Sequence, residues 1–139
     1  MAASIADFTY RDDQGAMTCL IYSQAQKEAW KDCWPTYYLE VKSTSGESHE
    51  SFFMSRNQLA TVRAIGSLRS THSLNIIKAM RLTRVDSTSP PKAIYVIIRV
   101  SGVRSQTIAW TTYPDPHHLF YTGRFLNVSR DGAEVKVAN

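Results

Sequence analysis

The segment Tyr37–Thr44 (YYLEVKST) constrains the fold of this chain more than any other segment. Its aromatic and β-branched residues favour a strand, which Pro35 precedes and Gly46 follows. Because side chains of a strand alternate between two faces, Glu40 and Lys42 share one face and lie roughly 7 Å apart at the backbone. Two interpretations remain open: a solvated, charge-compensated outer face, or a carboxylate and an ammonium that reach one metal-bound water.

Length and composition indicate an ordinary intracellular protein. A chain of 139 residues fits a single domain spanning the whole sequence, and 43% hydrophobic with 20% charged residues is typical of a globular fold. The net charge of +4 suits a polyanionic partner without requiring one. Cys19 and Cys33 have no metal-ligand spacing, and we find no signal peptide or membrane span, so we expect the nucleus or the cytoplasm.

The first third of the chain predicts a hairpin followed by a short polar segment. Two β-rich runs, Asp7–Tyr10 and Met17–Tyr22, flank a turn in which Gly15 would supply a positive φ. Residues 24–32 (QAQKEAWKD) are compatible with a short surface helix.

The middle of the chain predicts helix. Ser55 and Gln58 have the S-x-x-Q spacing of a capping box, so we expect a helix from Arg56 onward. Gly66 and the Ser/Thr-rich residues after it should interrupt this helix. Leu74–Leu82 has the apolar spacing of a second helical piece.

The remaining segments complete an α+β order. Residues 86–91 (DSTSPP) form a linker, and Ile94–Val100 is apolar enough to lie inside a sheet. Thr107–Trp110 should be its partner, and residues 134–137 a weak last strand. The sequence therefore predicts a mixed sheet of the hairpin, the central strand and this pair, with the helical region 56–82 on one face.

The predicted pairing brings a second carboxylate to the central strand. If the opening hairpin pairs with that strand, Asp7 can lie beside Glu40. Two carboxylates supply the hard oxygen ligands that Mg²⁺ prefers, and Lys42 could orient or help to deprotonate an attacking water. Spacing alone leaves this interpretation open, since many domains carry an Asp and an E-x-K by chance.

Several motifs together resemble a known family. Tyr38–Gly46 followed by Phe53–Gln58 is similar to the Y-I-E-V-K strand, polar loop and F-x-[LMI]-[ST]-x-N-[EQ] run of the NO VEIN C-terminal domain family, in a fungal-type form. Asp7–Asp12 resembles the family's acidic hairpin, and Ile94–Val100 resembles its late Y-x-[LI]-[YFI]-R-V strand. The resemblance extends from Asp7 to about Pro116.

The resemblance implies a PD-(D/E)XK nuclease-like site in a restriction-endonuclease-like core. On that implication Asp7 and Glu40 are metal ligands, joined by the backbone carbonyl of Val41. Lys42 is the water-positioning base, and Gln58 is an auxiliary site residue. The implied cofactor is Mg²⁺, with Mn²⁺ as a substitute.

Comparison with the family pattern predicts two departures from it. Such folds usually begin with a helix ahead of the acidic hairpin, and this chain starts close to Asp7, so we expect an N-terminally truncated core without its first helix. Residues 62–78 interrupt the family's helix, and we hypothesise that they are a translated intron or a late insertion.

Two functions follow as hypotheses. The first is a Mg²⁺-dependent endonuclease that acts on nucleic acid, DNA rather than RNA. The alternative is a catalytically inactive module of the same fold that serves as an interaction or scaffold domain, with the other domains of a longer protein as its partners.

Overall fold

The computed structural model describes residues 6–47, 50–68, 90–128 and 134–138. In chain order its elements are β1 (Phe8–Arg11), α1 (Ala16–Ile21), α2 (Gln24–Ala29), β2 (Thr36–Ser43), β3 (Phe52–Phe53), α3 (Arg56–Leu68), β4 (Ala93–Ser101), β5 (Ala109–Pro114), α5 (Pro116–Tyr121), β6 (Phe125–Asn127) and β7 (Glu134–Val137).

The strands form a four-stranded sheet in the order β1-β2-β4-β5 and a three-stranded sheet in the order β3-β7-β6. In the larger sheet β1 is antiparallel to β2, β2 is parallel to β4, and β4 is antiparallel to β5. This mixed sheet and the α+β class confirm the coarse prediction. β5 begins two residues later than predicted and runs on to Pro114. Of the smaller sheet, only β7 was predicted.

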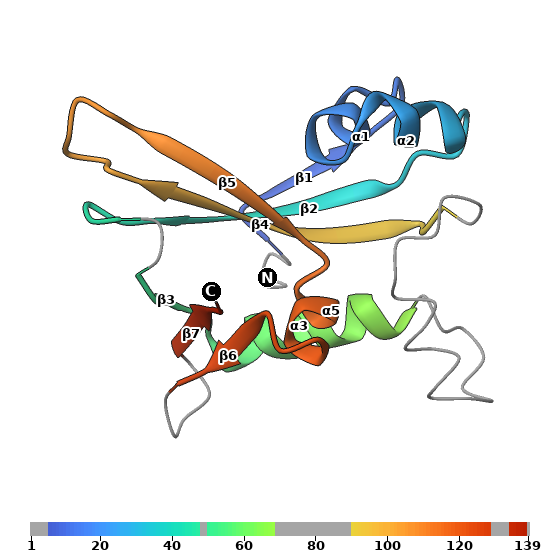
Figure 1. Cartoon of the computed structure of the whole chain (residues 1–139). Coiled ribbons are helices and arrows are strands. Elements are labelled where there is room, and N and C mark those ends of the chain that lie inside the picture. Colours follow the sequence, from blue (N-terminus) through green and yellow to red (C-terminus); the bar gives the residue numbers. More distant parts are fainter. Residues whose placement is uncertain (1–5, 48–49, 69–89, 129–133, 139) are drawn as a thin grey trace.

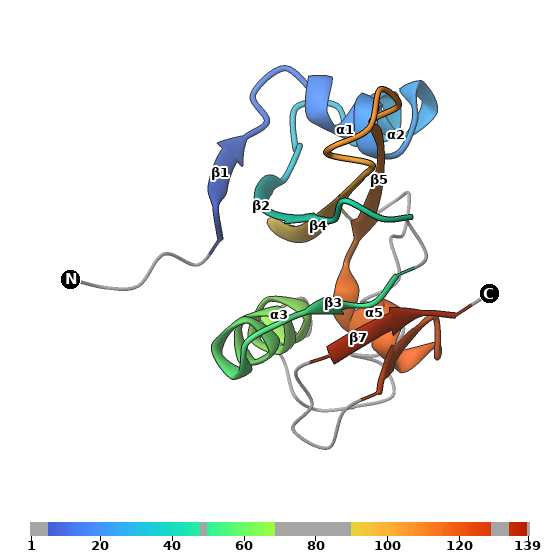
Figure 2. The same ribbon diagram turned by 90° about the vertical axis from the view of Figure 1, so that its left-hand side faces the viewer.

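Both faces of the larger sheet are covered (Figure 1). Helices α1 and α2 lie on one face, while α3, α5 and the three-stranded sheet lie on the other, as Figure 2 also shows. Each face has its own apolar core. The first contains Trp30, Tyr37, Leu39, Ile94 and Val96. The second contains Ala6, Phe52, Met54, Val62, Ile65, Tyr95, Ile97, Phe125 and Val135.

The prediction that Met17–Tyr22 form the second strand of a hairpin is wrong, because Ala16–Ile21 form α1. Gly15 has the expected positive φ of 76°, yet it caps a helix and does not turn a hairpin. The carboxylate of Asp12 accepts hydrogen bonds from the backbone N–H groups of Met17 (3.3 Å) and Thr18 (2.8 Å), which would otherwise lack partners at the helix start. This local cap outweighs the β propensity of the segment.

Helix α3 starts where the capping box predicts. The backbone N–H of Gln58 donates to Ser55 Oγ (3.1 Å), and the backbone N–H of Ser55 donates to Gln58 Oε1 (2.9 Å). The helix continues through Gly66 to Leu68, so the predicted interruption at Gly66 is wrong. The hypothetical insertion 62–78 begins inside α3, and its remainder lies outside the described residues. So do the predicted helical piece Leu74–Leu82 and most of the linker 86–91.

Candidate functional site

The structure places Asp7 beside Glu40, as the predicted pairing requires. Phe8 of β1 lies opposite Leu39 of the antiparallel strand β2, so the residue before Phe8 comes opposite Glu40. The backbone N–H of Asp7 donates to Glu40 Oε2 (3.3 Å), and Asp7 Oδ2 accepts from the backbone N–H of Val41 (2.9 Å). Two hydrogen bonds therefore tie the acidic end of β1 to the E-x-K segment.

Glu40 is the centre of the site, and it is buried with 5% exposure. The Lys42 ammonium lies 3.3 Å from Glu40 Oε1, and Gln58 Nε2 donates to the same oxygen. The interpretation of this face as a solvated outer face is therefore wrong, because α3 and the smaller sheet cover it (Figure 1). Lys42 keeps a route to solvent, with 18% of its side chain exposed.

Gln58 connects the start of α3 to the two charged residues. Its Oε1 accepts from Lys42 Nζ (3.0 Å) while it also completes the capping box with the Ser55 N–H. One amide side chain thus contacts Glu40, Lys42 and a helix N-terminus at once. One contiguous cluster therefore contains four residues that span 51 positions of the sequence (58 − 7): Asp7, Glu40, Lys42 and Gln58.

The backbone carbonyl of Val41 faces the same side as Asp7. Within a strand a residue's N–H and C=O leave the backbone in the same direction, and the Val41 N–H points to Asp7. Among the described residues β1 pairs with β2 only as far as Leu39, so this carbonyl lies on the β1 side of β2 just beyond that pairing. No cluster of three or more His, Cys, Asp or Glu side chains occurs in the described part of the chain. The oxygen donors near Glu40 are thus two carboxylates and one carbonyl, a set that suits Mg²⁺.

Tyr95 is a site residue that the sequence analysis missed. Its hydroxyl donates to Glu40 Oε2 at 3.5 Å, and only 1% of the residue is exposed. Burial raises the pKa of Tyr95, and the negative charges of Glu40 and Asp7 and the hydrogen bond to Glu40 raise it further. Tyr95 is therefore a neutral hydrogen-bond donor to Glu40. Its position opposite Tyr38 depends on the parallel register, which the sequence does not reveal.

Arg99 is a second missed residue, with 2% exposure at the far end of the cluster. Its guanidinium donates to the backbone carbonyls of Lys42 (Nη1, 3.3 Å), Glu50 (Nη2, 3.1 Å) and Ser51 (Nη2, 3.4 Å), and it lies 5.5 Å from the centre of the Phe52 ring. Burial lowers the pKa of Arg99, and the charge of Glu50 opposes that shift. Arg99 fixes β3 and the Lys42 backbone to β4.

Among the hollows of the described residues, one adjoins β2 and another adjoins α3. One of about 320 Å³ adjoins Lys42 and is lined by Val41, Lys42, Ser43, Thr44, Ser51, Phe52, Phe53 and Arg99. We call it the β2-edge pocket.

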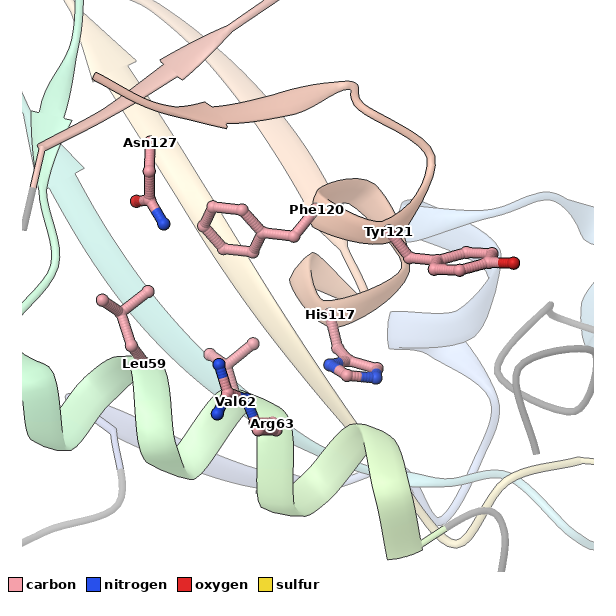
Figure 3. Close-up of a pocket in the computed structure, with 7 residues that line it drawn as sticks. All are labelled: Leu59, Val62, Arg63, His117, Phe120, Tyr121 and Asn127. Atoms are coloured by element: carbon pink, nitrogen blue, oxygen red, sulfur yellow. The ribbon is translucent and has the colours of Figure 1, made fainter. Parts of the chain in front are cut away.

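The other hollow, of about 300 Å³, lies between α3, α5 and β6 (Figure 3). In Figure 3 the Phe120 ring projects into the space between α3 and β6, and the Tyr121 ring points away from it. No predicted site residue lines this second hollow, although α3 supplies residues to both the hollow and the cluster.

Comparison with models of protein families, with curated proteins and with solved structures gives no match. No helix among residues 6–47, 50–68, 90–128 and 134–138 has the length and apolar character needed to cross a membrane. The distinguishing feature of the described chain is the cluster around Glu40, in which two acidic residues meet a lysine and an amide.

Proposed function

We propose that this chain carries a PD-(D/E)XK nuclease-like domain of the NO VEIN C-terminal type, which hydrolyses phosphodiester bonds of DNA with a divalent metal ion. The observation that supports it best is the junction of Asp7 with Glu40. Carboxylates on directly opposite residues of paired strands repel each other unless cations compensate them; Lys42 pairs with Glu40 here, and such an arrangement is common at sites that work with a cation.

The residues fit a hard divalent metal. Asp7, Glu40 and the Val41 carbonyl would hold it, since all three offer oxygen atoms at the same edge of β2. When bound, Mg²⁺ or Mn²⁺ would neutralise charge on the phosphate and lower the pKa of a coordinated water.

Lys42 and Gln58 would position the attacking water. An ammonium has three N–H donors; here Lys42 Nζ donates to Gln58 Oε1 and forms an ion pair with Glu40 Oε1. The third donor is available to a water or a phosphate oxygen. Because both acceptors are themselves fixed, by β2 and by the capping box of α3, the ammonium has little freedom to move away.

The order of elements also supports a restriction-endonuclease-like core. The acidic residue precedes β1, E-x-K lies on the neighbouring strand β2, a helix follows, and β4 then pairs in parallel with β2. Helix α1 stands where the β-rich run Met17–Tyr22 predicted the second strand of a hairpin, and α2 lies within the segment 24–32 that was predicted to be compatible with a short helix.

A plasmid-nicking assay with Mg²⁺ or Mn²⁺ tests the proposal. We expect the wild type to nick DNA, and Glu40→Gln and Lys42→Met to lose roughly a hundred-fold or more in rate, since each removes a group that acts on the reacting water. Asp13→Asn and Lys31→Met, which change exposed charges away from the cluster, are matched controls and should keep the wild-type rate.

Calorimetry with Mn²⁺ on the wild type and Glu40→Gln adds a measurement independent of turnover. Binding that Glu40→Gln abolishes supports a metal site at Glu40. A folded wild type that neither binds metal nor nicks DNA would refute the nuclease and favour the inactive interaction module, in which the cluster only joins β1, β2 and α3.

A further inference from the structure

The β2-edge pocket is continuous with the candidate site. Lys42 belongs to both, and the pocket follows the edge of β2 from Val41 to Thr44, beyond the last residue of β2 that pairs with β1 among the described residues. Ser43 lies two residues beyond Val41, so its backbone N–H and C=O point to the same edge of β2. A ligand in this pocket would therefore lie directly beside the Lys42 ammonium.

The charge beside this pocket favours an anion. The Arg99 guanidinium donates to neutral carbonyls, and no carboxylate of the described residues forms an ion pair with it. A buried cation without a paired carboxylate is weakly screened, so its positive potential extends into the adjacent hollow. Glu50 reduces this potential: its exposed carboxylate does not line the pocket but accepts a hydrogen bond from Thr44 Oγ1 (2.9 Å), at the end of the pocket.

An exposed aromatic ring borders the same pocket. Phe53 is 68% exposed, while its neighbour Phe52 is buried with 4% exposure and packs against Arg99. A single exposed Phe is ordinary on a protein surface. Here it lies beside a cationic hollow of about 320 Å³, at the lower end of the volumes of ligand pockets. An aromatic face next to a positive site is the arrangement that holds one base and its phosphate.

We propose that the β2-edge pocket binds one unpaired nucleotide of a single-stranded nucleic acid, its base stacked on Phe53 and its phosphate near Lys42. The inference rests on the proposed function for the placement of the scissile bond next to this nucleotide. An unpaired base is required because the faces of stacked bases in a duplex are not available to a side chain.

Fluorescence anisotropy of a labelled oligothymidylate of about ten nucleotides, in EDTA so that no cleavage occurs, tests this site. We expect Phe53→Ala to weaken binding roughly ten-fold and Phe53→Trp to retain it, since stacking needs only an aromatic face. Trp110→Ala is the matched control, because Trp110 is another exposed aromatic (55%) that does not line the pocket and lies on β5, two strands from β2 at the other edge of the sheet, and it should bind as the wild type does.

Three results would each overturn the subsite: equal affinity of Phe53→Ala and the wild type, an equal loss in Trp110→Ala, or a duplex of the same length that binds as tightly as the single strand. The outcome of this binding experiment can be distinguished from the outcome of the nicking assay. Phe53-dependent binding without nicking leaves the subsite standing and removes the nuclease, while nicking without Phe53-dependent binding does the reverse.

Discussion

Two buried carboxylates, Asp12 and Glu40, differ in how the chain supplies their partners. Their exposures are similar, 2% for Asp12 and 5% for Glu40. Asp12 takes its hydrogen bonds from residues five and six positions away: the backbone of Met17 and the backbone N–H and hydroxyl of Thr18 (2.8 and 2.7 Å). It is a helix cap that lies within a short segment of the chain.

Glu40 takes its partners from four separate segments. They are the backbone N–H of Asp7, the Lys42 ammonium two residues along β2, the Gln58 amide from α3 and the Tyr95 hydroxyl from β4. One partner is a cation that is still 18% exposed, and Asp7 adds a second negative charge nearby. The comparison teaches that equal burial of a carboxylate can arise in two ways, from a local helix cap or from a cluster assembled from several segments of the chain.

The largest expected difference between the two residues is in stability. Asp12→Ala leaves the N–H and hydroxyl of Thr18 buried without their acceptor, so we expect the free energy of unfolding to fall by about 3 kcal/mol. Glu40→Gln keeps the shape and one acceptor oxygen but turns an NH₂ group toward donors that Glu40 accepts from, so we expect a smaller loss of about 2 kcal/mol. Urea denaturation measures both. Equal losses would contradict the distinction between a carboxylate held by a local cap and one held by a cluster of several segments.

The sequence could predict features that depend on neighbouring residues. The capping box of Ser55 and Gln58 places the start of α3, and the alternation in Tyr37–Thr44 places Glu40 and Lys42 on one face. The same local rules failed at α1, because β propensity was given more weight than the Asp12 cap, whose spacing of six residues to Thr18 is not a standard capping motif.

Features that depend on register could be predicted only in part. Asp7 beside Glu40 followed from the assumption that β1 pairs with β2. The positions of Tyr95 and Arg99 required the parallel pairing of β2 with β4, and an apolar strand offers no signal that fixes this register. Nor does alternation reveal that the smaller sheet covers the Glu40 face. The roles of the cluster in catalysis remain predictions.

High pH should lower the stability of the fold through Tyr95, which lies beside Glu40. Burial raises the Tyr95 pKa above its ordinary value of 10.0, as do Glu40 and Asp7. The folded state then retains a proton that the unfolded chain releases, so this contribution to stability is fully present below pH 10 and is lost as the pH rises through the folded pKa.

Near pH 11 the wild type should therefore lose about 1 kcal/mol relative to Tyr95→Phe, which has no proton to release. Urea denaturation of both proteins near pH 7.5 and pH 11 measures the change in their difference, in which the contributions of the other tyrosines cancel. A difference that is the same at both pH values would show that Tyr95 titrates alike in the folded and unfolded states.

The smallest expected effect is the loss of stability on removing the hydroxyl of one of two buried tyrosines. Tyr37 contacts Thr18, whose hydroxyl donates to Asp12, and Tyr95 contacts Glu40. Tyr37 OH lies 2.8 Å from Thr18 Oγ1, whereas Tyr95 OH lies 3.5 Å from Glu40 Oε2, at the limit of a hydrogen bond. At neutral pH we expect Tyr37→Phe to destabilise the fold by about 1 kcal/mol and Tyr95→Phe by about half of that, because a longer bond contributes less.

A double-mutant cycle of Tyr37→Phe with Thr18→Val supplies the control for the shorter contact. A coupling energy of about 0.5 kcal/mol or more would assign the loss to the hydrogen bond between the two hydroxyls. If Tyr95→Phe instead proves the more costly change at neutral pH, the Tyr95 hydroxyl holds Glu40 more strongly than its 3.5 Å separation indicates. The Glu40 cluster would then be held as strongly as the Asp12 cap. The two carboxylates would differ only in the charged groups near Glu40.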